Sequence, residues 1–358
     1  LCYNIGVDIS QKFLEDLKHM TVKIGINGFG RIGRLAFRRI LELSDKASDI
    51  EVVAINDLTS PDMLAYLLKY DSIHGTLHAD VSSDESGIIV NGKHYAVYSE
   101  RNAADLKWVA NDGVDYVLEA TGFYTSAEKS QAHLDAGAKK VLVSAPAGAV
   151  PTVVYGVNQD ILTADDKIVS AGSCTTQSLA PIANVLEKEF GVKTGLMLTV
   201  HAYTASQSLQ DGPKSANFAK RQANRDAASN SLPHSSGAAK AIGLVVPSLD
   251  GKLTGSAIRV PVPDGSITEL TAVLKKDVTV EEVNAAMKKY ESDSFGYNGD
   301  GLVSTDIIND THGTVFDPTQ TEVVAGEGQQ LVKVAAWYDN EYGFTSNMIR
   351  TLLHFATL

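Results

Sequence analysis

The sequence predicts an α/β protein with a Rossmann-type doubly wound parallel sheet, followed by a mixed or antiparallel α+β domain. From residue 21 onward, short apolar runs alternate with helix-periodic segments, as in βαβ units. A G-x-G-x-x-G motif joins the first apolar run to the first of these segments. After Cys174 the apolar runs become longer and fewer helical segments separate them, which is typical of antiparallel or mixed sheets.

The first half of the chain contains the elements of a parallel sheet in order. A strand at 22–26, a helix at 32–43 and a strand at 51–55 make up the first βαβ unit. The later elements are a helix at 61–70, a hairpin strand at 95–98, a strand at 116–118, a helix at 127–136 and a strand at 140–143. Because strands and helices alternate, we expect most neighbouring strands to be parallel.

The second half predicts longer strands and ends in a helix. The expected strands are 195–204, 253–261, 267–274 and 331–338, and the helix covers 341–355. Between Tyr203 and Pro233 lies a polar segment rich in Ser, Ala, Asn, Gln and Lys. Because this segment is too long for a simple connecting loop in a compact enzyme, we expect a functional or interface loop there.

Residues 1–20 precede this pattern of strands and helices. They lack the basic start, the apolar centre and the small-residue cleavage site of a signal peptide. His19 and Met20 stand directly before the first predicted strand. We therefore expect Met20 to be the native start, and residues 1–20 to be a fused or vector-derived extension.

The composition narrows the classes of function. The chain has 358 residues, of which 44% are hydrophobic, enough for two domains with cores of their own. Its 31 Lys and Arg against 43 Asp and Glu give a net charge of −12, which repels nucleic-acid phosphates and anionic membranes. Two cysteines, Cys2 and Cys174, are too few for a disulfide framework, so a reducing cytoplasm is expected. No run approaches the ~20 apolar residues of a membrane span.

A glycine-rich turn predicts a dinucleotide site between the first strand and the first helix. The motif consists of Gly28, Phe29, Gly30, Arg31, Ile32 and Gly33. Its glycines let the backbone approach a pyrophosphate, whose charge the helix N-terminus stabilises. Asn56 and Asp57 end the second strand, where a carboxylate accepts hydrogen bonds from ribose hydroxyls and repels a 2′-phosphate. The sequence therefore favours NAD over NADP.

Cys174 is a candidate nucleophile at a loop-to-helix junction. Unpaired backbone N–H groups at a helix N-terminus stabilise a thiolate. A small cysteine often serves only in packing, and a histidine at a strand end is often structural. The pairing with His201, near the end of a later strand, favours catalysis because a cysteine nucleophile needs a base. We expect the helix and the His201 imidazolium to lower the Cys174 pKa strongly.

From Thr21 to its last residue the chain closely resembles the glyceraldehyde-3-phosphate dehydrogenase family. The segments that carry the resemblance are 26–34, 120–123, 143–146, 173–176, 201–204, 236–240, 259–261 and 337–342. The resemblance implies the glycolytic, phosphorylating oxidation of glyceraldehyde 3-phosphate to 1,3-bisphosphoglycerate with NAD and inorganic phosphate. The route would be a thiohemiacetal and then a thioester on Cys174. A cytoplasmic homotetramer is implied as well.

The resemblance also implies roles for individual residues. Arg31 and Ile32 would hold the pyrophosphate, and Asp57 the adenosine ribose. Asn340 would orient the nicotinamide carboxamide. Further cofactor contacts are implied for Phe29, Asn56, Arg101, Thr121, Gly122, Ser144 and Tyr342. The C3 phosphate of the substrate would bind Thr204 and Arg259, and inorganic phosphate would bind Ser173, Thr175, Ser236 and Gly237. No metal is expected.

These roles define an expected domain order. An NAD-binding domain would cover residues 21–173 and a catalytic domain residues 174–339. Residues 340–358 would form a C-terminal helix that returns to the NAD-binding domain.

Several positions depart from the family pattern. Gln177 stands where Asn is usual, and its extra methylene can disturb the seating of the helix that begins near Cys174. Ser178 replaces a frequent second cysteine, which excludes a disulfide within that helix turn. Ser236 replaces Thr but keeps the hydroxyl, and the segment 214–225 is longer and more divergent than expected.

Two other functions stay open at this point. Erythrose-4-phosphate dehydrogenase shares the fold and the Cys/His pair, and relative kcat/KM for the two aldehydes would separate it. The alternative from another class is a surface-displayed binding or adhesion protein that keeps the enzyme fold. Cys174, His201, Arg259 and Asp57 are all present, which argues against adhesion as the main role.

Overall fold

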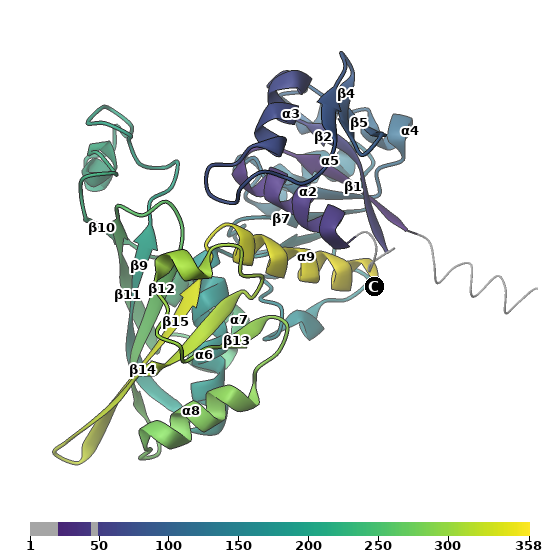
Figure 1. The fold of residues 1–358 in the computed structure, drawn as a ribbon. Helices are drawn as coiled ribbons and strands as arrows, with labels where there is room; N and C mark the ends of the chain where they lie inside the picture. Colours follow the sequence, from purple (N-terminus) through teal and green to yellow (C-terminus); the bar gives the residue numbers. More distant parts are fainter. Residues whose placement is uncertain (1–20, 44–48) are drawn as a thin grey trace, which may run out of the picture.

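The computed structural model describes residues 21–43 and 49–358, so the expectation for residues 1–20 lies outside the described residues. Its strands form two sheets, one in each half of the chain (Figure 1). The first sheet is mostly parallel and the second is mixed. The fold class predicted from the sequence is therefore confirmed.

The first sheet has the strand order β3-β4-β5-β2-β1-β6-β7-β8. Its strands are β1 (Val22–Asn27), β2 (Ile50–Asn56), β3 (Val81–Ser83), β4 (Gly87–Val90), β5 (Lys93–Tyr98), β6 (Tyr116–Glu119), β7 (Lys140–Val143) and β8 (Ile168–Ser170). β1 pairs in parallel with both β2 and β6, so the chain reverses its direction of winding at β1. Ligands of such sheets bind at this point, beyond the carboxyl ends of the strands.

Helices cover both faces of the first sheet. They are α2 (Arg31–Leu43), α3 (Pro61–Lys69), α4 (Trp108–Asp112), α5 (Ala127–Asp135) and α9 (Tyr342–Ala356). α2, α3 and α9 share one apolar core with the sheet, and α4 packs with the other face. α9 follows the second sheet in sequence but lies beside α2, as Figure 1 shows. Phe344, Met348, Leu352 and Phe355 of α9 are at most 4% exposed.

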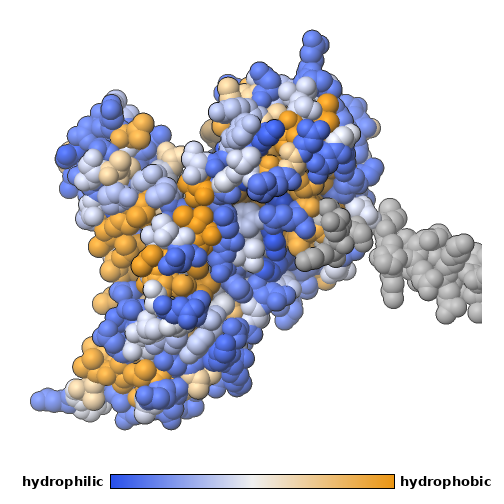
Figure 2. Space-filling view, in the orientation of Figure 1, coloured by the Kyte–Doolittle hydropathy of each residue, from blue (hydrophilic) through white to orange (hydrophobic). Residues whose placement is uncertain are grey.

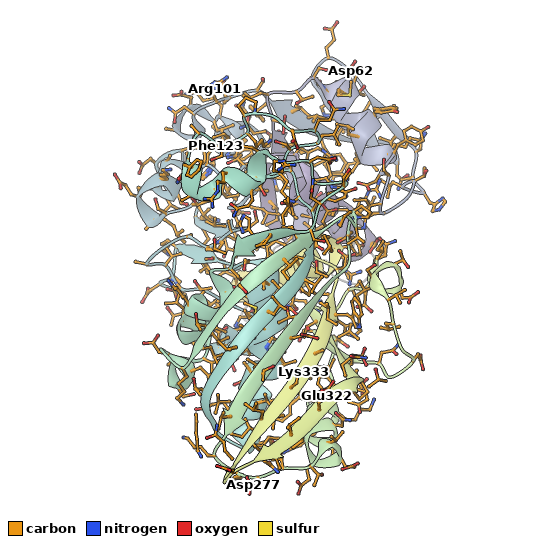
Figure 3. The ribbon with its side chains drawn as sticks, turned by 90° about the vertical axis from the view of Figure 1, so that its left-hand side faces the viewer. Asp62, Arg101, Phe123, Asp277, Glu322 and Lys333 are labelled. Atoms are coloured by element: carbon orange, nitrogen blue, oxygen red, sulfur yellow. The ribbon has the colours of Figure 1, made fainter. Side chains whose placement is uncertain are left out.

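The second sheet has the strand order β10-β11-β9-β12-β15-β14-β13. Its strands are β9 (Val192–Ala202), β10 (Leu232–Ser235), β11 (Leu253–Val260), β12 (Ser266–Leu274), β13 (Phe295–Tyr297), β14 (Thr314–Gly326) and β15 (Gln329–Tyr338). The helices α6 (Cys174–Glu189), α7 (Ala238–Val245) and α8 (Val280–Lys289) build a core on one face. Figure 3 shows the opposite face, where Lys333 and Glu322 pair across β15 and β14.

The strand β14 is the main element that the sequence does not predict. Pro318 interrupts the apolar alternation, and the register with β15 shifts between Asp317 and Glu322. Proline has no N–H for the ladder and is tolerated in a strand at such an irregularity. β14 therefore continues through a segment whose sequence predicts the end of a strand.

Candidate active site

The three glycines of the turn between β1 and α2 have different environments. Gly28 has φ +90°, and a Cβ there would lie 2.8 Å from the Thr121 backbone nitrogen. A Cβ at Gly33 would lie 2.0 Å from the Gly28 carbonyl oxygen, so the turn packs tightly against its own helix. Gly30 faces open space. The turn therefore leaves backbone accessible at Gly30, at the N-terminus of α2, as a pyrophosphate requires.

A hollow of about 550 Å³ opens next to this turn, at the carboxyl ends of β1, β2, β5 and β6. Its lining residues are Asn27, Gly28, Gly30, Asn56, Asp57, Leu58, Glu100, Arg101, Ala120, Thr121, Phe123 and Tyr124. Leu58 is 55% exposed and Phe123 is 76% exposed, so the hollow has apolar edges suited to a planar base. Figure 3 shows Phe123 and Arg101 in the upper, first-sheet half of the molecule.

Asp57 is held at the rim of this hollow by backbone groups. Its Oδ2 accepts a hydrogen bond from the Phe29 N–H at 2.8 Å, and its Oδ1 accepts one from the Thr59 N–H at 2.9 Å. The glycine turn and the carboxylate are thus fixed relative to each other. The arrangement fits a dinucleotide with a free ribose diol.

A buried polar network supports the floor of the hollow. The Glu119 carboxylate accepts hydrogen bonds from Asn27 Nδ2 at 2.6 Å and from the Thr121 N–H at 2.7 Å, and it contacts His133 Nε2 at 2.9 Å. Asn56 Nδ2 donates to Asn27 Oδ1 at 2.7 Å. The sequence pattern alone does not single out Glu119 or His133. The available signal was a charged residue at the end of an apolar strand.

The Arg31 side chain pairs with two carboxylates, and the expected contact of Arg31 and Ile32 with the pyrophosphate stays a prediction. The Arg31 guanidinium pairs with Asp71 at 2.5 Å and, through Nε, with Glu341 at 3.0 Å. Burial lowers the pKa of Arg31, but the two carboxylates outweigh burial and raise that pKa above its ordinary value. The side chain therefore joins α2 to the turn after β15, and only the backbone of Arg31 and Ile32 belongs to the glycine turn.

Tyr342 also lies away from the hollow described above. Its hydroxyl donates a hydrogen bond to the Glu42 carboxylate, and its ring borders a different hollow with His74 and His78. Ser144 and Gly122 follow β7 and β6, and the Ser144 N–H donates to the Glu119 carbonyl. The expectation of a Tyr342 contact with the cofactor is therefore not supported by its placement.

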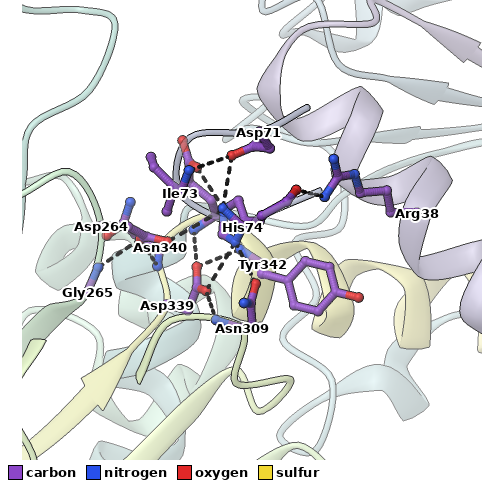
Figure 4. Close-up of polar contacts among 12 residues, drawn as sticks. Arg38, Asp71, Ile73, His74, Asp264, Gly265, Asn309, Asp339, Asn340 and Tyr342 are labelled. Carbon is purple, nitrogen blue, oxygen red and sulfur yellow. Dashed lines mark hydrogen bonds and ion pairs between the residues drawn. The ribbon is translucent and has the colours of Figure 1, made fainter. Parts of the chain in front are cut away.

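Asn340 lies beside a buried cluster of ionisable groups (Figure 4). His74 Nε2 contacts the Glu341 carboxylate at 3.0 Å and lies 3.7 Å from Asp264 Oδ2. Asp264 is 1% exposed, and burial together with the neighbouring Asp339 raises its pKa to about 9. Asp264 is therefore a neutral acid near pH 7, and its Oδ1 accepts the Asn340 N–H at 3.2 Å.

Cys174 is the first residue of α6, and its sulfur faces His201. Ser173 caps this helix, because its Oγ accepts a hydrogen bond from the Thr176 N–H at 3.1 Å. His201 is the penultimate residue of β9, and its Nε2 lies 3.3 Å from Cys174 Sγ. Two elements that are adjacent in sequence thus bring a thiol and an imidazole into contact.

Burial and the Arg259 charge are the largest influences on the pKa values of this pair. Burial raises the Cys174 pKa, and Arg259 and Thr175 lower it by less. Burial and then the Arg259 charge lower the pKa of His201 to about 3. The imidazole is thus neutral near pH 7. These directions differ from the expected imidazolium and the expected lowered Cys174 pKa, because burial outweighs the Arg259 charge and the Thr175 hydrogen bonds at the thiol.

Neutral His201 can still serve as a base. Its Nδ1 lies 2.7 Å from the Ala202 carbonyl oxygen, which can only accept, and 2.6 Å from Arg259 Nη1, which can only donate. We take the tautomer whose ring hydrogen is on Nδ1 and is donated to Ala202. The lone pair of Nε2 then faces the thiol. Arg259 Nη1 donates to the same Ala202 carbonyl at 2.9 Å. β11 and β9 place Arg259 directly opposite His201 in register.

The hydroxyls expected to bind phosphate are only partly free. Thr175 Oγ1 lies 3.1 Å from the buried Tyr338 hydroxyl, so this side chain points into the protein. Ser236 Oγ accepts the Ala238 N–H at 3.3 Å, and Gly237 caps α7. Thr204 Oγ1 contacts Ser206 Oγ at 2.9 Å. Both the hydroxyl and the backbone N–H of Thr175 also hydrogen-bond the Cys174 thiol, and the expected contact with phosphate stays a prediction.

Comparison with known proteins identifies this arrangement. The family model for the NAD binding domain of glyceraldehyde 3-phosphate dehydrogenase matches residues 22–127, and the model for its C-terminal domain matches residues 173–340. The chain belongs to the glyceraldehyde-3-phosphate dehydrogenase family. It is therefore an NAD-dependent oxidoreductase.

Relatives in the glyceraldehyde-3-phosphate dehydrogenase family match almost the whole chain. The glyceraldehyde-3-phosphate dehydrogenase of Lactobacillus delbrueckii subsp. bulgaricus is 66% identical over 340 residues, covering 95% of this chain and 100% of the relative. That of Streptococcus pyogenes serotype M1 is 52% identical over 341 residues, covering 95% and 99%. Among residues 21–43 and 49–358, no helix combines the length and apolarity needed to cross a bilayer.

Gln177, the departure from the glyceraldehyde-3-phosphate dehydrogenase pattern next to the nucleophile, is well accommodated. It is fully buried, and its Nε2 donates to the Ala171 carbonyl at 2.9 Å. Its Oε1 accepts a hydrogen bond from Asn347 Nδ2 on α9. Ser178 Oγ lies 3.2 Å from Thr314 Oγ1. The extra methylene therefore lets Gln177 join α6 to α9, and the helix stays seated.

Proposed function

We propose that the chain oxidises glyceraldehyde 3-phosphate with NAD and inorganic phosphate to 1,3-bisphosphoglycerate, with Cys174 as nucleophile and His201 as base. The observation that carries this proposal is the 3.3 Å contact between Cys174 Sγ and His201 Nε2 at the N-terminus of α6. A thiol beside a free imidazole lone pair can attack an aldehyde and transfer its proton to the imidazole nitrogen.

The first half of the reaction uses only these two side chains. Cys174 Sγ bonds to the aldehyde carbon while the thiol proton passes to His201 Nε2. The oxygen that gains negative charge takes this proton back, and the helix N-terminus stabilises the charge in between. His201 then removes the hydroxyl proton as the C–H bond breaks, which leaves a thioester on Cys174.

NAD, when bound, supplies the acceptor for the hydride. The residues that would hold it are the backbone of 28–33, Asp57 and the edges of the hollow, with Asn340 directed to the nicotinamide carboxamide. The open Gly30 and the fixed carboxylate of Asp57 support this assignment. Because a carboxylate accepts ribose hydroxyls and repels a 2′-phosphate, the proposal includes a preference for NAD over NADP.

Inorganic phosphate completes the second half of the reaction. Its attack on the thioester carbon breaks the C–S bond and returns the thiol to Cys174, so an acyl phosphate leaves. We assign this phosphate to Ser173, Ser236, Gly237 and the Thr175 backbone, and the substrate C3 phosphate to Thr204 and Arg259. Arg259 supports this assignment because its Nε is buried and has no hydrogen-bond partner among the described residues, so the guanidinium has donor capacity left.

A burst experiment tests the phosphate requirement. Mixing enzyme, NAD and glyceraldehyde 3-phosphate without phosphate should release about one NADH per active subunit and then stall, because the thioester lacks an acceptor. Phosphate or arsenate should restart turnover, and Cys174→Ser should abolish the burst. Steady turnover at full rate without phosphate would contradict the phosphorylating reaction, while leaving the fold and the cofactor unaffected.

A homotetramer is the proposed assembly. Leu196 of β9 is 64% exposed, and Figure 2 shows an apolar patch on the half of the molecule that holds the second sheet. The polar loop between Tyr203 and Pro233 projects from the body in Figure 1 and exposes Leu209 and Phe218 by 82% and 78%. Partner subunits would cover both features. A monomer mass near 38 kDa by light scattering would refute the tetramer.

The proposed domain division and location follow from the same features. The core that α9 shares with α2 supports the return of residues 340–358 to an NAD-binding domain at 21–173, with the catalytic domain at 174–339. The presence of only two cysteines supports a reducing, cytoplasmic location. Fractionation of the native host with an antibody to the chain would test the location.

A further inference from the structure

Ser266 lies between the base and the residue assigned to the nicotinamide. It is the first residue of β12 and is 1% exposed. Its Oγ accepts a hydrogen bond from the Ala202 N–H at 3.0 Å and donates one to Asn340 Oδ1 at 2.7 Å. One hydroxyl therefore touches both the end of β9 and the turn after β15.

On the β9 side, Ser266 replaces a missing ladder partner. The pairing of β9 with β12 ends at Val200 and Ile267, so the Ala202 N–H lies beyond it. Ala202 is also the residue whose carbonyl oxygen lies 2.7 Å from His201 Nδ1. Ser266 thus fixes the backbone that orients the imidazole.

On the other side, Ser266 determines which way the Asn340 amide faces. A hydroxyl has one hydrogen, and because Ser266 Oγ already accepts from Ala202, that hydrogen is free to be donated. It goes to Asn340 Oδ1, which turns Nδ2 away from Ser266. The backbone of Asn340 is held as well, since its N–H donates to Asp264 Oδ1 (Figure 4).

We propose that Ser266 is a positioning residue that keeps the Nδ2 donor of Asn340 directed to the nicotinamide carboxamide. Without the Ser266 hydroxyl, the amide can turn and present oxygen or nitrogen, so the ring loses its anchor. The inference rests on the proposed function, because it takes the nicotinamide to lie at Asn340.

The test compares two ligands that differ only in the nicotinamide. Binding of NAD and of ADP-ribose to the full chain is measured by calorimetry for wild type, Ser266→Ala and Ser266→Thr. Loss of one hydrogen bond should weaken NAD binding by roughly tenfold in Ser266→Ala. ADP-ribose should bind with unchanged affinity, and Ser266→Thr, which keeps a hydroxyl, should restore NAD binding.

Two controls separate positioning from general disruption. Ser178→Ala removes another buried hydroxyl hydrogen bond, to Thr314, and should leave both affinities unchanged. Asn340→Ala should weaken NAD binding alone, and adding Ser266→Ala to it should cause no further loss. If the extra methyl group prevents Ser266→Thr from folding, the comparison of Asn340→Ala with the double variant still tests the proposal.

The face of hydride transfer gives a second measurement. With substrate deuterated at the aldehyde carbon, wild type should place deuterium on one face of the nicotinamide, and Ser266→Ala should place a measurable fraction on the other. Unchanged NAD affinity in Ser266→Ala, or equal weakening of NAD and ADP-ribose, would overturn the proposal. Failure of the proposed function is a different result, since wild type itself would then show no phosphate-dependent NADH formation.

Discussion

Arg259 and Cys174 contact opposite nitrogens of the His201 ring. Arg259 Nη1 lies 2.6 Å from Nδ1, and the Cys174 sulfur lies 3.3 Å from Nε2. The arginine charge disfavours a second proton on the ring. In the tautomer that donates from Nδ1 to the Ala202 carbonyl, Nε2 is left to accept from the thiol, and Arg259 is a charged neighbour of Nδ1 rather than its hydrogen-bond donor. The same arginine that we assign to the substrate phosphate thus also sets the state of the base.

Replacing Arg259→Gln should raise the His201 pKa above its value of about 3, because a positive charge that disfavours the imidazolium is removed. The pKa should stay below the ordinary value, since burial is the larger cause. NMR titration of the imidazole, assigned with His201→Asn, measures the shift. Arg259→Lys keeps the charge and should keep the pKa low, and an unchanged titration in Arg259→Gln would contradict the contact.

His201→Asn should slow the alkylation of Cys174 by iodoacetamide near neutral pH. The expected decrease in rate is about tenfold or more, as for the loss of a general base. The reason is that the thiol loses the nitrogen that accepts its proton. His78→Asn, at an exposed position, serves as the matched control. Peptide mapping must follow Cys174 separately from Cys2. A Cys174 rate profile that the His201 change leaves unmoved would show the pairing to be misassigned.

Asp57→Ala should lower kcat/KM for NAD and narrow its advantage over NADP, each by roughly one to two powers of ten, since two ribose hydrogen bonds and a repulsive charge are lost together. Initial rates with both coenzymes measure the ratio. Asp62→Ala, an exposed carboxylate at the start of α3, should change neither value. Equal kcat/KM for NAD and NADP in the wild type would already refute the assignment.

Gln177→Asn, the residue usual in the family, should destabilise this chain by about 1–3 kcal/mol, because the shorter amide cannot reach both Ala171 and Asn347 and leaves a buried group unpaired. Chemical denaturation measures the free energy of unfolding. In a double-mutant cycle with Asn347→Ala the two losses should not add. Equal stability of Gln177→Asn and wild type would mean that the α6–α9 contact contributes nothing.

Asp264→Asn should flatten the dependence of stability on alkaline pH. The folded-state pKa of Asp264 is raised to about 9 while an unfolded aspartate titrates near its ordinary value of about 4. Its contribution to stability therefore falls as pH rises from about 4 to about 9 and is lost above that. An amide cannot ionise, yet its oxygen still accepts from Gly265 and Asn340. Tm measured from pH 6 to 10 should therefore fall less in Asp264→Asn. If Tm depends on pH in the same way in wild type and in Asp264→Asn, Asp264 is not the cause of the loss of stability at high pH.

The sequence predicted the sheet class, the glycine turn, Asp57 and the Cys174–His201 pair. These features depend on local patterns: alternating apolar runs, glycines at fixed offsets, and reactive side chains at element ends. The pKa direction of Cys174 could not be predicted, because desolvation depends on neighbours that are distant in the chain. For the same reason, the sequence did not predict the carboxylate partners of Arg31 or the contact of the Thr175 hydroxyl with Tyr338. It did not predict β14 because Pro318 interrupts the strand pattern.

The placement of α9 has a consequence for synthesis on the ribosome. The first sheet is complete in strands by residue 170, yet Phe344, Met348 and Phe355 belong to its core. A nascent chain therefore carries an uncovered apolar surface on α2 throughout the translation of the second sheet. The half made first can reach its final packing only after the half made second, so chaperone occupancy should be highest during this interval.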